Sequence, residues 1–195
     1  MGHKARLLPF EGMISTLLAQ LGVIHAFKVE EIAKDSDRWQ AKVIARDGGP
    51  EALLTDVGFG VSQVLPIVTL LQYVPKGSTV ILEQPEIHLH PSAQENLADV
   101  IINAAFHRGV QVILESHSEH LLLRLQRRIA EGSVDASEVN LYFCDNINGK
   151  SVIAPLDLDM FGQIRNWPDK FMGDAFGETA KAEIARLRRM KAAAE

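Results

Sequence analysis

Two polar clusters in the sequence have residue types that could bind a nucleotide, and each follows a short apolar segment. Glu83 follows residues 79–82 (TVIL), and residues 115–118 (ESHS) follow residues 110–114 (VQVIL). An acid at the end of a rigid strand can hold the magnesium ion of a nucleotide through its oxygens or through water. The histidine of the second cluster can contact a terminal phosphate and hold the attacking water. Together the clusters predict a site for a nucleotide with its magnesium ion.

The elements expected around these clusters would bring them to one edge of a sheet. Both apolar segments are short and rich in β-branched residues, which predicts buried strands. Between them, Pro91 suits the first turn of a helix that ends near Gly109. Ser118 can cap a second helix that closes near Gly132, and a third strand is expected at residues 139–143. This alternation indicates a parallel sheet, in which ligands bind beyond the carboxyl ends of the strands.

The first fifty residues predict a smaller β element ahead of this sheet. A helix is expected at about residues 11–21, followed by strands at 25–32 and 39–45 that a polar turn joins. An amphipathic helix is expected at the carboxyl end, around residues 176–187. The fold class is therefore α/β, with a mainly parallel sheet flanked by helices, an amino-terminal antiparallel β element and a carboxyl-terminal helix.

A glycine-rich segment precedes the apolar helical stretch at residues 64–73. Its small and polar residues are Gly58, Gly60, Ser62 and Gln63. Small residues at the start of a helix let backbone N–H groups approach a phosphate, and the helix terminus adds favourable partial charge. The alternative is a glycine-rich turn between a strand and a core helix.

The glycine-rich segment and the two polar clusters, in this order along the chain, resemble the carboxyl-terminal half of an ABC-type ATPase head. The resemblance covers residues 56–129, and it is to the prokaryotic AAA-type ATPases related to the SMC, RecF and OLD-nuclease ATPases. It implies that residues 57–63 are the signature loop, which caps the nucleotide of the opposite subunit. It also implies that Glu83 is the Walker B acid, that residues 88–90 belong to the D-loop region and that His117 is the switch histidine.

The resemblance further implies cofactors, partners and a setting. ATP and Mg²⁺ would be bound between two heads, in a homodimer or another head-to-head dimer, with Glu83 on the magnesium side. Closure of the dimer would act on DNA or on an effector nuclease, in DNA repair or antiphage defence. Residues 162–171, which include Gly162, Trp167, Pro168 and Phe171, resemble the uncharacterised carboxyl-terminal extension of many such proteins.

Two residues depart from the family pattern. Gln84 stands where the catalytic glutamate would follow the Walker B acid, and a carboxamide cannot take a proton from water. Hydrolysis is then slow or absent, or Glu86 replaces the missing base. Gly58 stands where the signature usually has serine, and Ser62 is the candidate to supply the hydroxyl instead.

The chain lacks the phosphate-binding loop that a complete site requires. Its one Gly-Lys-Ser sequence, at residues 149–151, has Cys144 in place of the first glycine of that motif. Asn148 and Gly149 between two β-type runs predict a hairpin there. The first fifty residues also hold no candidate for the strand that precedes the loop. We therefore expect an amino-terminal lobe with the Walker A loop, in the same protein or in a separate chain.

The composition is that of a folded, soluble protein. The chain has 195 residues, 47% of them hydrophobic, and a net charge of -5, which excludes a disordered chain and gives no overall basic field for nucleic acid. One cysteine excludes an internal disulfide. No signal peptide or membrane-spanning helix is predicted, so a cytoplasmic protein is expected. Three portions are expected: 1–55 with a helix and hairpin, 56–145 with the ATPase motifs, and 146–195 with a second hairpin and the extension.

Two other functions compete with the ATPase hypothesis. A metal-dependent hydrolase would use histidines and glutamates near the same edge, namely His88, His90, His117, His120, Glu83, Glu86 and Glu115. A non-catalytic interaction module would keep the ATPase motifs as a scaffold, and Gln84 favours this alternative.

Overall fold

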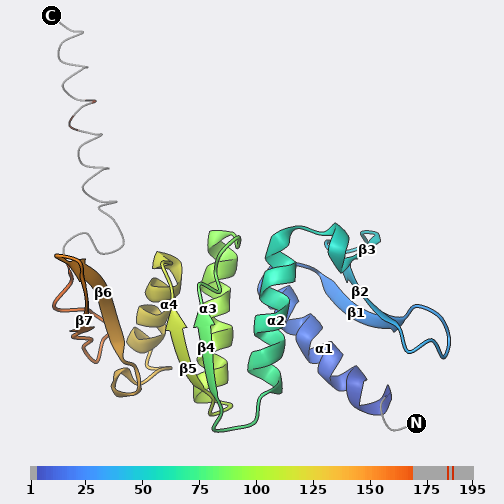
Figure 1. Ribbon diagram of the computed structural model, residues 1–195, viewed down its shortest axis with the longest axis horizontal. Coiled ribbons are helices and arrows are strands. Elements are labelled where there is room, and N and C mark those ends of the chain that lie inside the picture. Colours follow the sequence, from blue (N-terminus) through green and yellow to red (C-terminus); the bar gives the residue numbers. More distant parts are fainter. Residues whose placement is uncertain (1–3, 169–183, 185, 187–195) are drawn as a thin grey trace, which may run out of the picture. The chain divides into compact units, whose positions relative to one another are not determined.

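The elements along the chain follow the order that the sequence patterns predict (Figure 1). The computed structural model describes residues 4–168, 184 and 186. Apart from residues 184 and 186, the expected carboxyl-terminal helix lies outside these residues, as does Phe171. The chain divides into two compact units after Asp135, whereas the sequence suggested boundaries at residues 55 and 145. In the described part of the chain, no helix is long and apolar enough to cross a membrane.

The first unit begins with helix α1, which is followed by a three-stranded antiparallel sheet in the order β1-β2-β3. Helix α1 spans Lys4–Gln20, and the strands are β1 (Ala26–Glu31), β2 (Trp39–Ile44) and β3 (Glu51–Leu53). The predicted strands are confirmed, and so is the helix, which begins earlier than expected. β3 was not predicted because its three residues carry no strand pattern, and it forms through its pairing with β2.

Lysines and glutamates of this antiparallel sheet neutralise one another. Lys28 Nζ lies 2.5 Å from Glu51 Oε1, and Lys42 contacts Glu30. The hydrogen bond from Lys42, with a second from Gln40, lowers the pKa of Glu30 to about 2. The hydrogen bond from Lys28 likewise lowers the pKa of Glu51. These lysines are therefore paired within the sheet and do not form a basic patch.

The second part of this unit contains the predicted strand–helix–strand–helix sequence. After the 3-10 turn at Leu54–Asp56, helix α2 (Phe59–Tyr73) leads to strand β4 (Thr79–Glu83). Helix α3 (Pro91–Phe106) connects β4 to β5 (Gln111–Glu115), and the two strands pair in parallel. Helix α4 (Glu119–Ala130) follows and packs against α3. The predicted α/β fold class is confirmed.

The caps that the sequence predicted for these helices are present. The side chain of Ser118 accepts a hydrogen bond from Leu121 N at 3.1 Å and so caps α4. Pro91 occupies the first turn of α3. Gly109 and Gly132 follow the two helices with φ of 66° and 73°, a conformation that favours glycine. Local sequence therefore places both ends of each helix.

The core of this unit lies between one face of the parallel strands and the helices. Val80 and Leu82 of β4 are buried, as is every second residue in a strand that packs on one side. Leu97 of α3, Leu71 of α2 and Leu18 of α1 are fully buried in the same cluster. Val61 and Val64 at the start of α2 belong to this cluster too, so α2 and β4 share one hydrophobic core.

The second unit contains an antiparallel hairpin of β6 (Leu141–Ile147) and β7 (Lys150–Leu156), after a 3-10 turn at Ala136–Glu138. Asn148 and Gly149 form its two-residue turn with φ of 54° and 79°. The predicted hairpin is confirmed, and the Gly-Lys-Ser sequence is not a phosphate loop. The prediction that residues 139–143 form a third strand of the parallel sheet is wrong: β6, which begins at Leu141, pairs antiparallel with β7, and the two form a sheet separate from β4 and β5.

Arg108 stabilises the carboxyl end of α2. Its guanidinium donates hydrogen bonds to the carbonyl oxygens of Leu71 and Val74, the latter at 3.1 Å, where the helix would otherwise leave these groups unpaired. We expect Arg108→Ala to lower the free energy of unfolding by about 1–3 kcal/mol, measured by urea denaturation. Arg38→Ala, an exposed arginine in the turn after β1, is the matched control and should change it by less than about 0.5 kcal/mol. Equal effects of the two variants would contradict the capping role.

Candidate functional site

The carboxyl ends of β4 and β5 lie side by side. Glu83 and Glu115 are the last residue pair of the parallel register. Gln84 N donates a hydrogen bond to Glu115 O at 2.9 Å, which extends the pairing by one residue beyond the strands. His117 follows Glu115 by two residues, so the structure brings the Walker B candidate and the switch candidate to one edge. Both of these side chains are exposed.

The turn after β4 contains two residues in an unfavourable backbone conformation. Gln84 has φ of 44° and His88 has φ of 65°, in the left-handed region that side chains other than glycine rarely adopt. Pro85 between them is fully buried. Such conformations persist where the surroundings determine them and are frequent at functional sites. The turn is therefore held in one shape by its packing.

The switch candidate His117 is held through its backbone and faces solvent with its ring. Its N–H donates a hydrogen bond to Glu86 Oε1 at 3.0 Å. Its Nε2 lies 3.2 Å from Glu115 Oε1, and its side chain is 78% exposed. The imidazole is thus available to a ligand, while the position of its backbone is determined by the loop after β4. Sequence reasoning did not predict the contact with Glu86.

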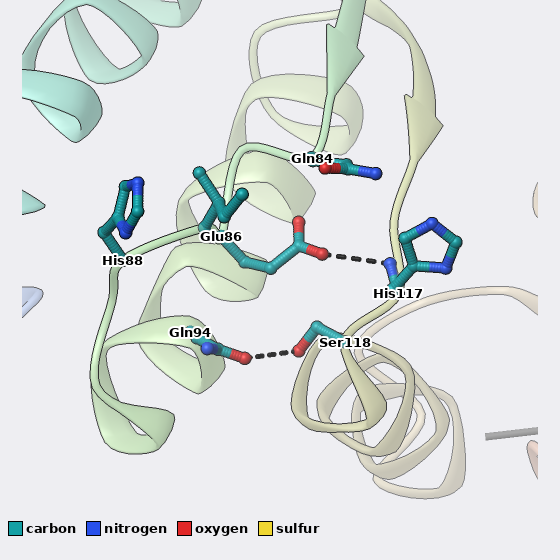
Figure 2. A pocket seen from close by; sticks show the side chains of 7 residues that line it. Gln84, Glu86, His88, Gln94, His117 and Ser118 are labelled. Carbon is teal, nitrogen blue, oxygen red and sulfur yellow. Dashed lines mark hydrogen bonds between the residues drawn. The ribbon is translucent and has the colours of Figure 1, made fainter. Parts of the chain in front are cut away.

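A cavity of about 320 Å³ lies between the loop after β4 and the loop after β5. Figure 2 shows Glu86 bonded to the backbone of His117 on one side of it and Gln94 bonded to Ser118 on another. The residues that line the cavity are Gln84, Glu86, Ile87, His88, Gln94, His117 and Ser118. The cavity therefore joins three of the predicted site residues, Gln84, Glu86 and His117.

The glycine-rich segment forms the first turn of α2. Gly58 is the N-cap residue, and no described side chain caps this helix, unlike α3 and α4. Ser62 is exposed and Gln63 is half-buried. Backbone N–H groups at such a terminus are available to an anion. The segment therefore leaves backbone donors at the start of α2 available to a phosphate, as the sequence prediction requires.

This segment also contacts the loop after β4, which sequence reasoning missed. A Cβ added at Gly60 would lie 3.2 Å from the carbonyl oxygen of His88 and 3.4 Å from Leu89 Cδ2. The ring of Phe59, which is 83% exposed, lies 6.2 Å from the ring of His88. Gly60 is therefore needed for the close approach of these two segments. In the sequence, only the adjacent Phe59 and Gly60 could have indicated this contact.

Ion pairs hold α4, and with it the loop that carries His117, against α3. Arg124 contacts Glu95 at 2.6 Å and Asp99 at 2.7 Å, and Arg128 contacts Asp99 at 2.7 Å and Glu131 at 2.8 Å. Burial acts to raise the pKa of Asp99, but the hydrogen bond from Arg128 and the charge of Arg124 outweigh it, so the pKa is lowered. These arginines are therefore engaged within the protein.

The histidines of the metal-hydrolase alternative do not converge. His90 Nδ1 lies 2.9 Å from Ser92 Oγ and caps α3, while His120 Nδ1 lies 3.8 Å from Glu95 Oε1 and does not line the cavity. Among the described residues, no group of three or more histidine, cysteine, aspartate or glutamate side chains could hold a metal ion. Glu83, an exposed carboxylate beside Glu115, fits the oxygen ligation of a magnesium ion that arrives with a nucleotide.

Comparison of the sequence with known families gives two matches. The family described as "AAA domain, putative AbiEii toxin, Type IV TA system" matches residues 18–124. A family described as a protein of unknown function, DUF3696, matches residues 134–181, which supports the resemblance of the tail to an uncharacterised extension. Among curated proteins, none matches the chain.

Solved structures of SMC ATPase heads share the fold. A structure from work on ATP-driven dimerisation and DNA-stimulated activation of SMC ATPases is 12% identical with a TM-score of 0.59, over 76% of this chain and 83% of that one. The SMC head of Pyrococcus furiosus with an extended coiled coil, bound to the carboxyl-terminal domain of ScpA, is 12% identical with a TM-score of 0.58, over 75% of this chain and 34% of that one. The SMC head of Pyrococcus yayanosii with a coiled coil and joint is 14% identical with a TM-score of 0.60, over 77% and 27%. The chain thus spans only about a quarter to a third of the Pyrococcus chains. The predicted likeness to an ABC-type ATPase head is confirmed.

Proposed function

We propose that this chain, which belongs to the AbiEii-type AAA-domain family, is the carboxyl-terminal lobe of an ABC-type ATPase head. The lobe binds ATP with Mg²⁺ in a composite site that two heads form together. The observation that carries the proposal is the paired end of β4 and β5, which brings Glu83, Gln84 and His117 to one edge. In parallel α/β sheets this edge is where ligands bind.

Each residue at the edge has a separate role in the proposal. The carboxylate of Glu83, carried by a rigid strand, holds the magnesium ion through water. The exposed imidazole of His117 contacts the terminal phosphate and orients the attacking water. Gln84 can hold that water by hydrogen bonds but cannot take its proton. The nucleotide supplies the reactive phosphoanhydride, and the chain supplies position and charge.

The first turn of α2 would face the nucleotide of a second head. Its open N-terminus and the side chains of Ser62 and Gln63 offer hydrogen-bond donors, and Gly58 and Gly60 let the backbone approach a phosphate. Two heads would then enclose nucleotide between them, in a homodimer or with a related head. The SMC structure associated with ATP-driven dimerisation supports this arrangement.

The parallel sheet supports completion by an amino-terminal lobe. β4 and β5 pair only with each other among the described strands, so each has an unpaired edge. Ile81 and Ile113, on the face opposite the core, are 66% and 52% exposed. A lobe that adds the Walker A strand beside β5 would pair that edge and cover these side chains. It would also bring the phosphate loop to the edge that holds His117.

Titration calorimetry with ATP and Mg²⁺ tests this proposal. The chain alone should bind with a Kd no tighter than about 1 mM, because half of the phosphate cradle is missing. Addition of the Walker A lobe, sought in the same gene or the gene just upstream, should tighten the Kd to the micromolar range. Micromolar binding by the isolated chain would contradict the need for a second lobe.

A non-catalytic interaction module is the second candidate, because Gln84 removes the expected base. In that case the assembled heads would bind ATP and close without hydrolysing it. Either function would act in the cytoplasm, on DNA or on an effector nuclease, in DNA repair or antiphage defence. The DNA-stimulated activation of the similar SMC ATPases supports a role on DNA. The toxin–antitoxin description of the family supports a role in defence.

A further inference from the structure

Glu86 links the loop after β4 to the loop after β5 through one buried oxygen. The residue is 6% exposed. Its Oε1 accepts a hydrogen bond from Ser116 Oγ at 2.7 Å and another from His117 N at 3.0 Å. Its Oε2 is also buried, and no hydrogen-bond partner for it lies within the described residues. Figure 2 shows the bond from the His117 backbone to this carboxylate.

The same carboxylate belongs to a closed circuit of hydrogen bonds. Ser116 Oγ accepts from Ser118 N at 3.0 Å, and Ser118 Oγ donates to Gln94 Oε1 at 2.6 Å. Gln94 Nε2 donates to Leu89 O at 2.9 Å, and Leu89 N donates to Glu86 O at 3.0 Å. The circuit joins the loop after β4, the first turn of α3 and the loop that carries His117. Because its members depend on one another, it holds these three segments in one arrangement.

We infer that Glu86 is a positioning residue that fixes His117 for contact with the phosphate, and not the base that replaces Gln84. This inference rests on the proposed function of the edge. One carboxylate oxygen already has two donors, and the other is shielded from solvent, so neither is placed to accept a proton from water. The ring of His117, by contrast, is exposed, and the backbone bond to Glu86 places it.

Two substitutions of Glu86 separate positioning from base catalysis. In Glu86→Gln the amide oxygen can still accept from Ser116 and His117, and the amide nitrogen takes the place of Oε2, which has no hydrogen bond to lose. Glu86→Ala removes the acceptor altogether. Ser116→Ala removes only one donor and serves as a second variant should Glu86→Ala fold poorly. Glu119→Gln, an exposed residue at the start of α4, is the matched control for the loss of charge.

The first measurement is hydrogen exchange of the His117 amide by NMR in the full chain, without nucleotide. Wild type, Glu86→Gln and Glu119→Gln should protect this amide to within about threefold of one another. Glu86→Ala should reduce the protection by about tenfold or more, and Ser116→Ala by less, since the loss of a buried acceptor frees the loop. Unchanged protection in Glu86→Ala would overturn the inference.

The second measurement is ATP hydrolysis by the chain assembled with its Walker A lobe. A positioning role predicts that Glu86→Gln keeps kcat within about threefold of wild type, while Glu86→Ala lowers kcat by about tenfold or more with little change in KM. A fall in Glu86→Gln as deep as in Glu86→Ala would identify a base and overturn the inference. If the assembled wild type does not hydrolyse ATP, the catalytic part of the proposed function fails, and the exchange measurement still decides whether Glu86 positions His117.

Discussion

Gln84→Glu is expected to raise the rate of ATP hydrolysis by the assembled head by about 10²–10⁴-fold, the contribution of a positioned general base. Gln84 is the first residue after β4, and its N–H is bonded to Glu115 O at 2.9 Å. Its side chain lines the same cavity as His117. A carboxylate at this position could accept a proton from the water that His117 orients, whereas the carboxamide of Gln84 can only hold that water by hydrogen bonds. Steady-state phosphate release measures the effect.

A matched control for this gain is Gln111→Glu, at the opposite end of β5. Thr79 Oγ1 donates to Gln111 Oε1 at 2.8 Å, and a glutamate can still accept this bond. The control adds the same charge at the other end of the parallel strands, away from the proposed site, so it should leave the rate unchanged. If Gln84→Glu also leaves the rate unchanged while ATP still binds, Gln84 does not lie at the reacting water. That result would favour the hypothesis of a non-catalytic interaction module.

Glu83→Gln is expected to lower hydrolysis by about 10²-fold or more, the range seen when one group is lost from a preorganised charged site. Glu83 is the exposed last residue of β4, and the pairing with Glu115 fixes its backbone. A neutral amide is a poor ligand for Mg²⁺ and for its waters. Calorimetry at several Mg²⁺ concentrations should show that the variant needs more magnesium for the same ATP affinity.

Glu31→Gln makes the same charge change at the end of β1 and should alter neither the rate nor the magnesium dependence. Normal hydrolysis by Glu83→Gln would contradict the assignment of Glu83 as the Walker B acid. Glu31 belongs to the antiparallel sheet and Glu83 to the parallel pair of strands. A general effect of lost negative charge would therefore appear in both variants. A specific effect would appear only at Glu83.

Much of the first unit could be predicted because its signals are local. The apolar run before Glu83, the proline that begins α3 and the serine that caps α4 each act within a few residues of their own position. The hairpin at Asn148 was predictable for the same reason, since two adjacent residues determine its turn. Strand β3 was not, because it forms only through its pairing with β2. The sheet to which β6 belongs was also not predictable, because the local pattern at residues 139–143 does not show whether its partner is β5 or β7.

The candidate site shows the same division. Residue type and spacing in the sequence predicted Glu83 and His117 as site residues, because an acid or an imidazole after an apolar strand has few structural uses, and the resemblance to ABC-type heads added Gln84. Only the tertiary structure decided the role argued for Glu86, whose bond to His117 joins residues 31 positions apart. It also decided the contact of Gly60 with His88, which depends on how α2 packs beside the loop after β4. Local sequence determined which chemical groups stand at the strand ends and how each helix begins and stops, whereas long-range packing determined which of those groups hold one another in place.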